Sequence, residues 1–145
     1  MPNIRWLLRI ITVLHRFLLR ISGGRIGARM AGMDMLLLEN VGRKSGTVRE
    51  TPLLFAENEG RFLVVASNLG DDRNPAWWLN LQARPEAAVR VGGKRIPIKA
   101  RAASSEEEAL LWPALDASWS QYAEYRARAK RHIPIVILAP TGTTA

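Results

Sequence analysis

Short apolar runs, separated by glycine, proline and polar turns, dominate the chain from residue 35 onward. Runs of this length that end at turn residues are typical of buried or half-buried β-strands. Pro52 places the second strand at a sheet edge or an irregularity, because proline cannot donate a ladder hydrogen bond. Gly92-Gly93 joins the fourth and fifth strands as a hairpin. The six expected strands are 35–41, 49–56, 62–67, 87–91, 96–102 and 133–138.

Three helical segments fall between these strands. Asn74-Pro75 begins a helix that runs through Gln82, since proline is favoured at the first helical position. Ser104, followed by a second serine and three glutamates, begins another, with acidic side chains at its positive end. A third helix is expected over 118–130. Short strands with inserted helices predict an α+β fold built on an antiparallel barrel or half-barrel.

The N-terminal segment 4–21 has a different pattern, that of an amphipathic helix. Arg5, Arg9, Arg16 and Arg20 share one helical face, and apolar side chains fill most of the remainder. Four arginines make a membrane span unfavourable, and they interrupt every apolar run before it reaches the length of a secretory signal. Three alternatives remain: the helix lies on an anionic membrane surface, it packs on the protein's own sheet, or it is a mitochondrial presequence if the organism is eukaryotic.

Four glycines follow this segment, so residues 22–33 are expected to be a linker. The predicted organisation is an N-terminal helix and linker over 1–33 and one barrel domain over 34–145. A chain of 145 residues with 48% apolar content is long enough to bury a core of its own.

Composition and charge exclude several classes of function. The net charge is +8, but six arginines and no acidic residue lie in the first 30 residues, so the excess charge is mainly N-terminal. This distribution argues against a nucleic-acid-binding body. The chain has no cysteine, and His15 and His132 are far apart in sequence, so no metal site is expected. We expect a cytoplasmic protein, peripheral on the inner face of the cell membrane.

The turn between the first two strands carries the clearest chemical signal. It reads Val41-Gly42-Arg43-Lys44-Ser45-Gly46 and is followed by Arg49. Glycine permits a close approach of the backbone, and the serine and the three cations can all donate to phosphate oxygens. The turn therefore predicts a site for a phosphate-bearing ligand. A solvated hairpin loop is the alternative, and the spacing does not fit a nucleoside-triphosphate loop.

Further segments, in the same order along the chain, resemble the deazaflavin-dependent nitroreductase family. They are the basic turn with Arg49 and Pro52-Leu53, Ala66-Ser67, Asn74-Pro75-Ala76-Trp77-Trp78-Leu79-Asn80-Leu81, Arg84-Pro85, Tyr122, Tyr125, Arg131 and Ile133-Pro134. The resemblance covers about residues 35–140. It implies a split β-barrel related to flavin-binding proteins, the coenzyme F420 (8-hydroxy-5-deazaflavin), and reduction of quinones and nitroaromatic compounds. Flavin mononucleotide is the alternative cofactor.

The resemblance also implies roles for individual residues. Arg43, Lys44, Ser45 and Arg49 would anchor the phosphate and acidic tail of the cofactor. The other residues implied to hold it are Pro52, Ala66, Ser67, Asn68, Pro75, Ala76, Trp77 and Asn80. Ser67, Tyr122 and Tyr125 would be the catalytic hydroxyl donors, and Trp119, Tyr122 and Tyr125 would line the substrate pocket. Since Trp77 and Trp78 are adjacent on a helix, we expect one of them to serve in packing.

The chain departs from the family pattern in two segments. Trp119 stands where a tyrosine is common, which changes the pocket wall, and Asn68-Leu69 replaces a lysine and a glycine, which removes a cation from the tail groove. The resulting hypothesis is an F420-dependent reductase of a lipophilic quinone or nitroaromatic acceptor. The alternatives are a non-catalytic deazaflavin carrier, a reductase of activated double bonds, and a basic binding module without cofactor. No sequence feature specifies an oligomeric state.

Overall fold

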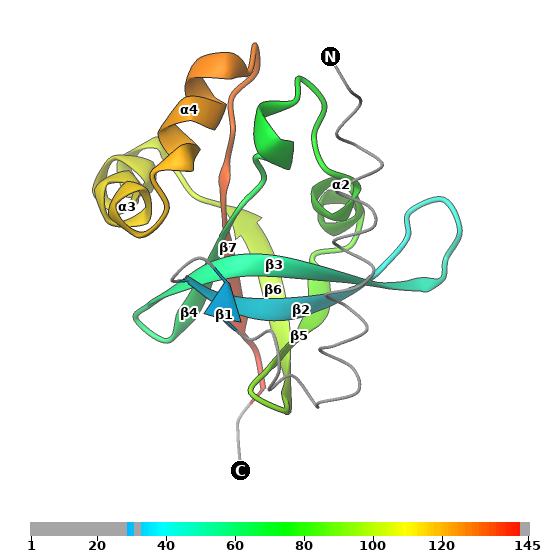
Figure 1. Cartoon of the computed structure of the whole chain (residues 1–145). Coiled ribbons are helices and arrows are strands. Elements are labelled where there is room, and N and C mark those ends of the chain that lie inside the picture. The colour runs from blue at the N-terminus through cyan, green and yellow to red at the C-terminus, as the bar shows by residue number, and fades with distance from the viewer. Residues whose placement is uncertain (1–28, 31–32, 143–145) are drawn as a thin grey trace.

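The computed structural model of the chain describes residues 29–30 and 33–142. Among them, six antiparallel strands form a closed barrel, in the order β2-β3-β4-β7-β6-β5, with β5 pairing back onto β2 and the short β1 added outside β2 (Figure 1). The strands are β1 (Arg29–Met30), β2 (Met33–Val41), β3 (Val48–Asn58), β4 (Arg61–Val65), β5 (Glu86–Val91), β6 (Lys94–Ala102) and β7 (Ile135–Pro140). The predicted α+β split barrel is confirmed.

The strand pairing explains the position of Pro52. The β2–β3 ladder runs from Asp34 opposite Phe55 to Val41 opposite Val48, whereas β3 pairs with β4 only over Ala56–Asn58. Pro52 therefore has a ladder partner on one side only, as its missing N–H requires. The predicted irregularity at this proline is confirmed.

Two expected boundaries differ from those observed. β1 and the start of β2 lie inside the stretch that we expected to be a linker, because Met30 pairs with Met33 in a tight ribbon. The last strand begins at Ile135, two residues later than expected, since the chain at 129–134 is occupied by contacts described below. The predicted helix over 4–21 and the first part of the linker lie outside the described residues.

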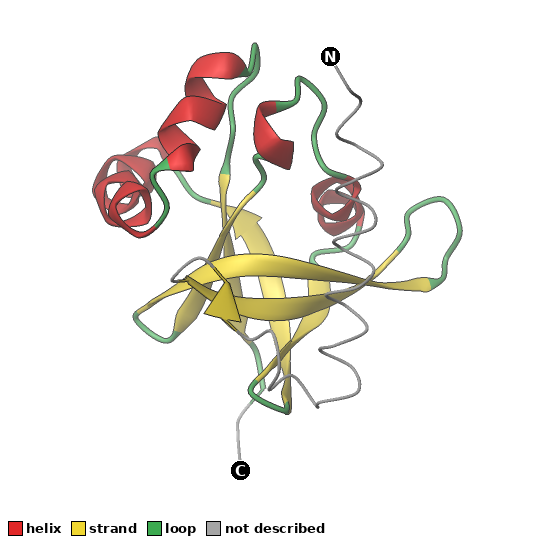
Figure 2. Ribbon diagram, viewed as in Figure 1, coloured by secondary structure: helices red, strands yellow, loops and turns green. Residues whose placement is uncertain are grey.

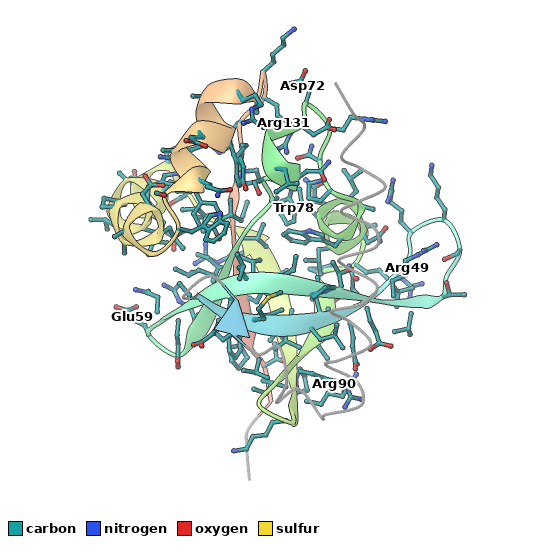
Figure 3. All side chains as sticks on the ribbon, in the orientation of Figure 1. Arg49, Glu59, Asp72, Trp78, Arg90 and Arg131 are labelled. Carbon is teal, nitrogen blue, oxygen red and sulfur yellow. The ribbon has the colours of Figure 1, made fainter. Side chains whose placement is uncertain are left out.

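Alternating side chains of the strands form two apolar layers. The barrel interior contains side chains such as Leu36, Leu38, Val64 and Val136, and α2 (Ala76–Ala83) adds Leu81 and two tryptophans to it. Both Trp77 and Trp78 are buried in this cluster, so packing involves both and not one of them. Figure 3 shows Trp78 between α2 and the sheet.

A second layer covers the outer face of β4 and β7. Here Leu63, Ile135 and Ile137 pack against α3 (Ser105–Ser118) and α4 (Gln121–Arg128). Figure 2 shows these two helices on one side of the barrel and α2 on another, with the 3-10 helix η1 (Asn68–Gly70) between them. No helix within 29–30 and 33–142 is long and apolar enough to cross a membrane.

Helix α3 begins where the serine and glutamate pattern predicted. Ser104 Oγ accepts from Glu107 N at 3.1 Å, and Glu107 Oε1 accepts from Ser104 N at 2.9 Å, so the two residues form a capping box. α4 is shorter than expected and begins only at Gln121, because α3 ends at Ser118 and the next residue, Trp119, is in an extended conformation with φ −147°.

Candidate functional site

The basic turn is a compact loop with its cations in solvent. Gly42 N donates to Thr47 O and Gly46 N donates to Gly42 O, both at 2.8 Å, and Gly46 takes φ 72°. Its four predicted anchors are all exposed: Arg43, Lys44, Ser45 and Arg49. Figure 3 shows Arg49 on this hairpin, beside α2. The turn therefore exposes three guanidinium or ammonium groups and one hydroxyl, and hydrogen bonds within the turn hold its backbone.

Two buried asparagines fasten this turn to α2. Asn40 Nδ2, from the end of β2, donates to Trp77 O at 3.0 Å, and Asn80 Oδ1, from α2, accepts from Arg43 N at 3.0 Å and from Arg43 Nη1 at 2.9 Å. Both asparagines are 3% exposed. We call Asn40, Asn80 and the groups they bind the asparagine clasp. It fixes both the backbone and the guanidinium of Arg43 relative to α2.

Three observations bear on whether this region fits a phosphate-bearing cofactor. Asn40 Oδ1 is buried and has no hydrogen-bond partner among the described residues. A Cβ at Gly42 would stand 2.6 Å from Ser45 Oγ and 3.1 Å from Arg49 Nε, so the side chains close in over this glycine. The exposed donors are those that bind phosphate and carboxylate best. The residues present fit a polyanionic cofactor.

A second part of the candidate site is the β4–α2 loop, residues 66–75. Ala66 and Ser67 are buried, and the residues after them have unusual backbone angles, with φ 46° at Asn68, 56° at Leu69 and 81° at Gly70. Left-handed conformations at two non-glycine residues are costly and persist only when the surrounding contacts impose them. Contacts with residues outside the loop therefore impose this backbone conformation.

Arg131, in the segment between α4 and β7, supplies much of that restraint. Its guanidinium donates to Ala66 O and Ser67 O from Nη2 and to Asp71 O from Nε, each at 3.0 Å. Nη1 donates to Asn74 Oδ1, also at 3.0 Å. Burial lowers the pKa of Arg131 from its usual value, while the nearby Asp71 and Asp72 oppose that shift. Arg131 belongs to the sequence resemblance, but no role for it could be predicted from the sequence.

Backbone contacts bring α4 against the same loop. A Cβ on Gly70 would lie 3.2 Å from Tyr125 Cα, so only glycine allows this approach at its positive φ. Arg128 Nη1 donates to Leu69 O at 3.3 Å, and Lys130 N donates to Asp72 Oδ1 at 2.9 Å. The predicted ring-lining residues and the predicted tyrosine helix are therefore neighbours in space.

The two tyrosines of α4 are buried in an aromatic cluster. Tyr122 makes edge contacts with Trp112 and Tyr125, at ring-centroid distances of 6.2 and 6.4 Å. Burial raises the pKa of Tyr122 well above its usual value, so its hydroxyl stays protonated, and Tyr125 Oη donates to Gln121 Oε1 at 2.7 Å. Trp119 is half-buried and packs against the same cluster.

The remaining predicted residues occupy intermediate positions. Pro75 is buried at the start of α2, Ala76 is exposed on its first turn, and Pro52 is half-buried on β3. The structure thus groups the predicted residues in two sets. One comprises the basic turn with α2, and the other comprises the β4–α2 loop with α4.

A closed antiparallel barrel, with a cationic turn fixed to a helix and a restrained loop beside it, defines the class of split-barrel proteins that bind flavin-like cofactors. Within that class, a family model described as F420H(2)-dependent quinone reductase matches residues 12–140. An F420H(2)-dependent quinone reductase of Mycobacterium tuberculosis is 37% identical over 142 residues, which cover 92% of this chain and 95% of the relative. The chain belongs to the F420H(2)-dependent quinone reductase family.

Solved structures agree with this assignment. A structure titled as an F420-H2 dependent reductase matches with a TM-score of 0.65 and 35% identity, over 72% of this chain and 92% of that one. Another, titled as a domain-swapped dimer, matches with a TM-score of 0.68 and 32% identity, over 87% and 96%. A haem storage protein of Vibrio cholerae, 12% identical with a TM-score of 0.57, over 75% of this chain and 82% of that one, shares the fold alone. The protein is an oxidoreductase, and its cofactor is F420.

Proposed function

We propose that this protein transfers a hydride from reduced F420 to a lipophilic quinone, with nitroaromatic compounds as further acceptors. The single observation that carries the proposal is the asparagine clasp, which holds Arg43 at the edge of α2 with Lys44 and Arg49 exposed beside it. An exposed cation that a buried asparagine holds in place is suited to a ligand, because a merely solubilising charge needs no such support.

Different residues of the chain would bind the tail of the cofactor and position its ring. Arg43, Lys44, Ser45 and Arg49 would hold the phosphodiester and the acidic tail through charge-assisted hydrogen bonds. Ala66, Ser67, Pro75 and Trp77 would place the ring between the β4–α2 loop and α2. When bound in its reduced form, F420 supplies the hydride, so the protein needs no nucleophile of its own.

The acceptor side would be formed by α4 and the end of α3. The hydroxyls of Ser67, Tyr122 and Tyr125 would donate to the oxygen on which negative charge develops as the quinone is reduced. Trp119 and the aromatic cluster would provide an apolar wall for a flat ring. A protonated Tyr122 is the form that this role requires.

A titration with two coenzymes tests the proposal. Deazaflavin fluorescence should show tight binding of F420 and weaker binding of flavin mononucleotide. The double substitution Arg43→Ala with Lys44→Ala should weaken F420 binding on the order of a hundredfold, since each charge-assisted bond contributes about 1.5–3 kcal/mol. Unchanged affinity in this double variant would refute the proposed cofactor site.

The acceptor is tested by single turnover. Menadione should oxidise the protein-bound reduced cofactor much faster than it oxidises the free cofactor. A carrier protein would give no acceleration, and a reductase of activated double bonds would prefer an unsaturated ketone in the same assay. The Trp119→Tyr variant should change the ranking among acceptors and leave F420 affinity unaltered.

We further propose that residues 4–21 bring the enzyme to an anionic membrane surface in the cytoplasm, where a lipophilic quinone is dissolved. Support comes from the four arginines on one face of an apolar segment. The full chain should co-sediment with vesicles that contain phosphatidylglycerol and not with phosphatidylcholine vesicles. Replacing Arg5, Arg9, Arg16 and Arg20 by glutamine should abolish this binding while menadione reduction in solution continues.

A further inference from the structure

The backbone donors of the β4–α2 loop are arranged for an acceptor that the described residues do not supply. Ser67 has right-handed angles (φ −78°, ψ −33°), and Asn68 and Leu69 are left-handed. A right-handed residue followed by a left-handed one turns successive N–H groups toward a common centre. Within the described part of the chain, the N–H groups of Ser67, Asn68 and Leu69 have no hydrogen-bond acceptor.

Arg131 engages the carbonyl side of two of these three peptide groups, and the third carbonyl, Asn68 O, accepts from Asp71 N at 3.1 Å. Nη2 donates to both Ala66 O and Ser67 O. These carbonyls belong to the peptide groups whose N–H donors are those of Ser67 and Asn68. Because a hydrogen bond from a cation polarises a peptide group, it also strengthens the donor at the opposite end of that group.

Other contacts of Arg131 hold the loop at both ends. Nε donates to Asp71 O and Nη1 to Asn74 Oδ1, so one guanidinium spans the loop from Ala66 to the residue before Pro75. Figure 3 shows Arg131 and Asp72 together at the end of the molecule that carries α4. A lysine could not reproduce this fork of donors, since its ammonium is a single point of contact.

We propose that Arg131 is a positioning residue for cofactor binding: it holds the β4–α2 loop so that the N–H groups of Ser67, Asn68 and Leu69 donate to bound F420. Arg131 itself does not touch the cofactor and acts through the peptide groups of residues 66–68. The inference rests on the proposed placement of the ring beside this loop.

The Arg131→Lys variant tests this role, with Arg101→Lys as the matched control. Arg101 donates to both carboxylate oxygens of Glu107, at 2.7 and 2.9 Å, and has no hydrogen bond to the loop among the described residues. Both substitutions keep the charge and lose a fork of hydrogen bonds. Arg131→Lys should raise the dissociation constant of F420 at least about tenfold, the loss expected for one charge-assisted bond. Arg101→Lys should lower Tm with F420 affinity within twofold of wild type.

A rescue experiment separates positioning from general stability. In Arg131→Ala, guanidinium chloride at tens of millimolar should restore F420 affinity and kcat/KM in part, while equal sodium chloride should not. An Arg131→Lys protein that folds, shows a lower Tm and keeps wild-type F420 affinity would overturn the proposal.

Hydrogen exchange on the wild-type protein gives a readout that needs no variant. Addition of F420 should slow exchange of the amide protons of Ser67, Asn68 and Leu69 on the order of tenfold or more. Unprotected amides in the saturated complex would overturn the proposal. In one outcome, the double variant Arg43→Ala with Lys44→Ala loses F420 affinity while F420 leaves amide exchange in the wild-type protein unchanged and Arg131→Lys keeps wild-type F420 affinity. In that case the proposed function stands and this inference falls. If F420 affinity is unchanged in the double variant and in Arg131→Lys, and F420 does not slow amide exchange, both the proposed function and this inference fall.

Discussion

The carboxamide oxygen of Asn80 accepts two hydrogen bonds from Arg43, one from the backbone N at 3.0 Å and one from Nη1 at 2.9 Å. A neutral acceptor orients the guanidinium without cancelling its charge. The same geometry with a carboxylate would form an ion pair and leave less positive potential for a bound anion. The choice of amide over acid at this position is therefore a determinant of anion affinity.

Replacing Asn80 by aspartate tests that statement. Asn80→Asp should keep the fold and weaken F420 binding about tenfold, a change of ~1.4 kcal/mol. The salt dependence of binding should also become shallower, because one cation no longer contributes. Fluorescence titration at two ionic strengths measures both effects. Gln82→Glu adds the same charge at an exposed position on α2 and should weaken F420 binding less than Asn80→Asp does. An equal loss of affinity would mean that only the net charge of this region matters, and not the contact with Arg43.

A methyl group at Gly42 should disturb the basic turn through crowding. Its Cβ would meet Ser45 Oγ at 2.6 Å, and Gly42 does not have a positive φ that would add backbone strain. We expect Gly42→Ala to lower the free energy of unfolding by about 1–3 kcal/mol, as overpacking commonly does. Denaturant titration measures this loss. Adding Ser45→Ala removes the atom in the way and should recover part of the loss; a double variant as unstable as the sum of both single changes would contradict this cause.

Glu107 should make stability depend on pH in the acidic range. Hydrogen bonds from Arg101 and from the Ser104 backbone lower the pKa of Glu107 from 4.5 to about 2. A carboxyl with a lowered folded-state pKa stabilises the fold above its unfolded pKa, and this contribution is lost as the pH falls from 4.5 toward 2. The Tm difference between wild type and Glu107→Gln should be largest near neutral pH and disappear at the acid end. Glu106→Gln, at an exposed neighbour on α3, should show no such trend.

The two tyrosines of α4 should contribute unequally to turnover. Burial in the aromatic cluster raises the pKa of Tyr122 well above its usual value and keeps its hydroxyl protonated, and Tyr125 Oη would have to leave Gln121 Oε1, to which it donates at 2.7 Å, in order to donate to a quinone. Tyr122→Phe should lower kcat/KM for menadione on the order of ten- to a hundredfold, with F420 affinity unchanged. Tyr125→Phe should have the smaller effect. Steady-state kinetics with both substrates varied measures this difference, and the reverse order would assign the acceptor to Tyr125.

Much of the barrel could be predicted from the sequence because its signals are local. The apolar runs at 62–67 and 133–138 and the Gly92-Gly93 turn each determine a strand or a hairpin from a few residues. Closure of the barrel could not be predicted in this way, because the pairing of Leu37 with Arg90 depends on how distant strands meet. Neither could the break between α3 and α4 at Trp119, which packs on the second apolar layer.

The candidate site divides in the same manner. Exposed cations in a glycine turn are visible in sequence, so the basic turn was found. The contacts of the asparagine clasp could not be predicted from the sequence. Asn40 follows Leu36 and Leu38 with the spacing of an inward-facing position, and that spacing is a signal for a buried polar residue. The role of Arg131 is not visible in the sequence, since its partners Ala66 and Ser67 lie 65 and 64 residues earlier in the chain.

The hydrogen bonds from Arg131 to the carbonyls of Ala66 and Ser67 join the segment before β7 to the residues after β4, and these two strands are neighbours in the barrel but the last and the fourth of the described strands. A ribosome delivers residue 131 long after residue 66. A nascent chain therefore has the basic turn before it has the residue that restrains the β4–α2 loop. Premature termination before the final strand should yield a polypeptide that attracts anions yet cannot seat the coenzyme.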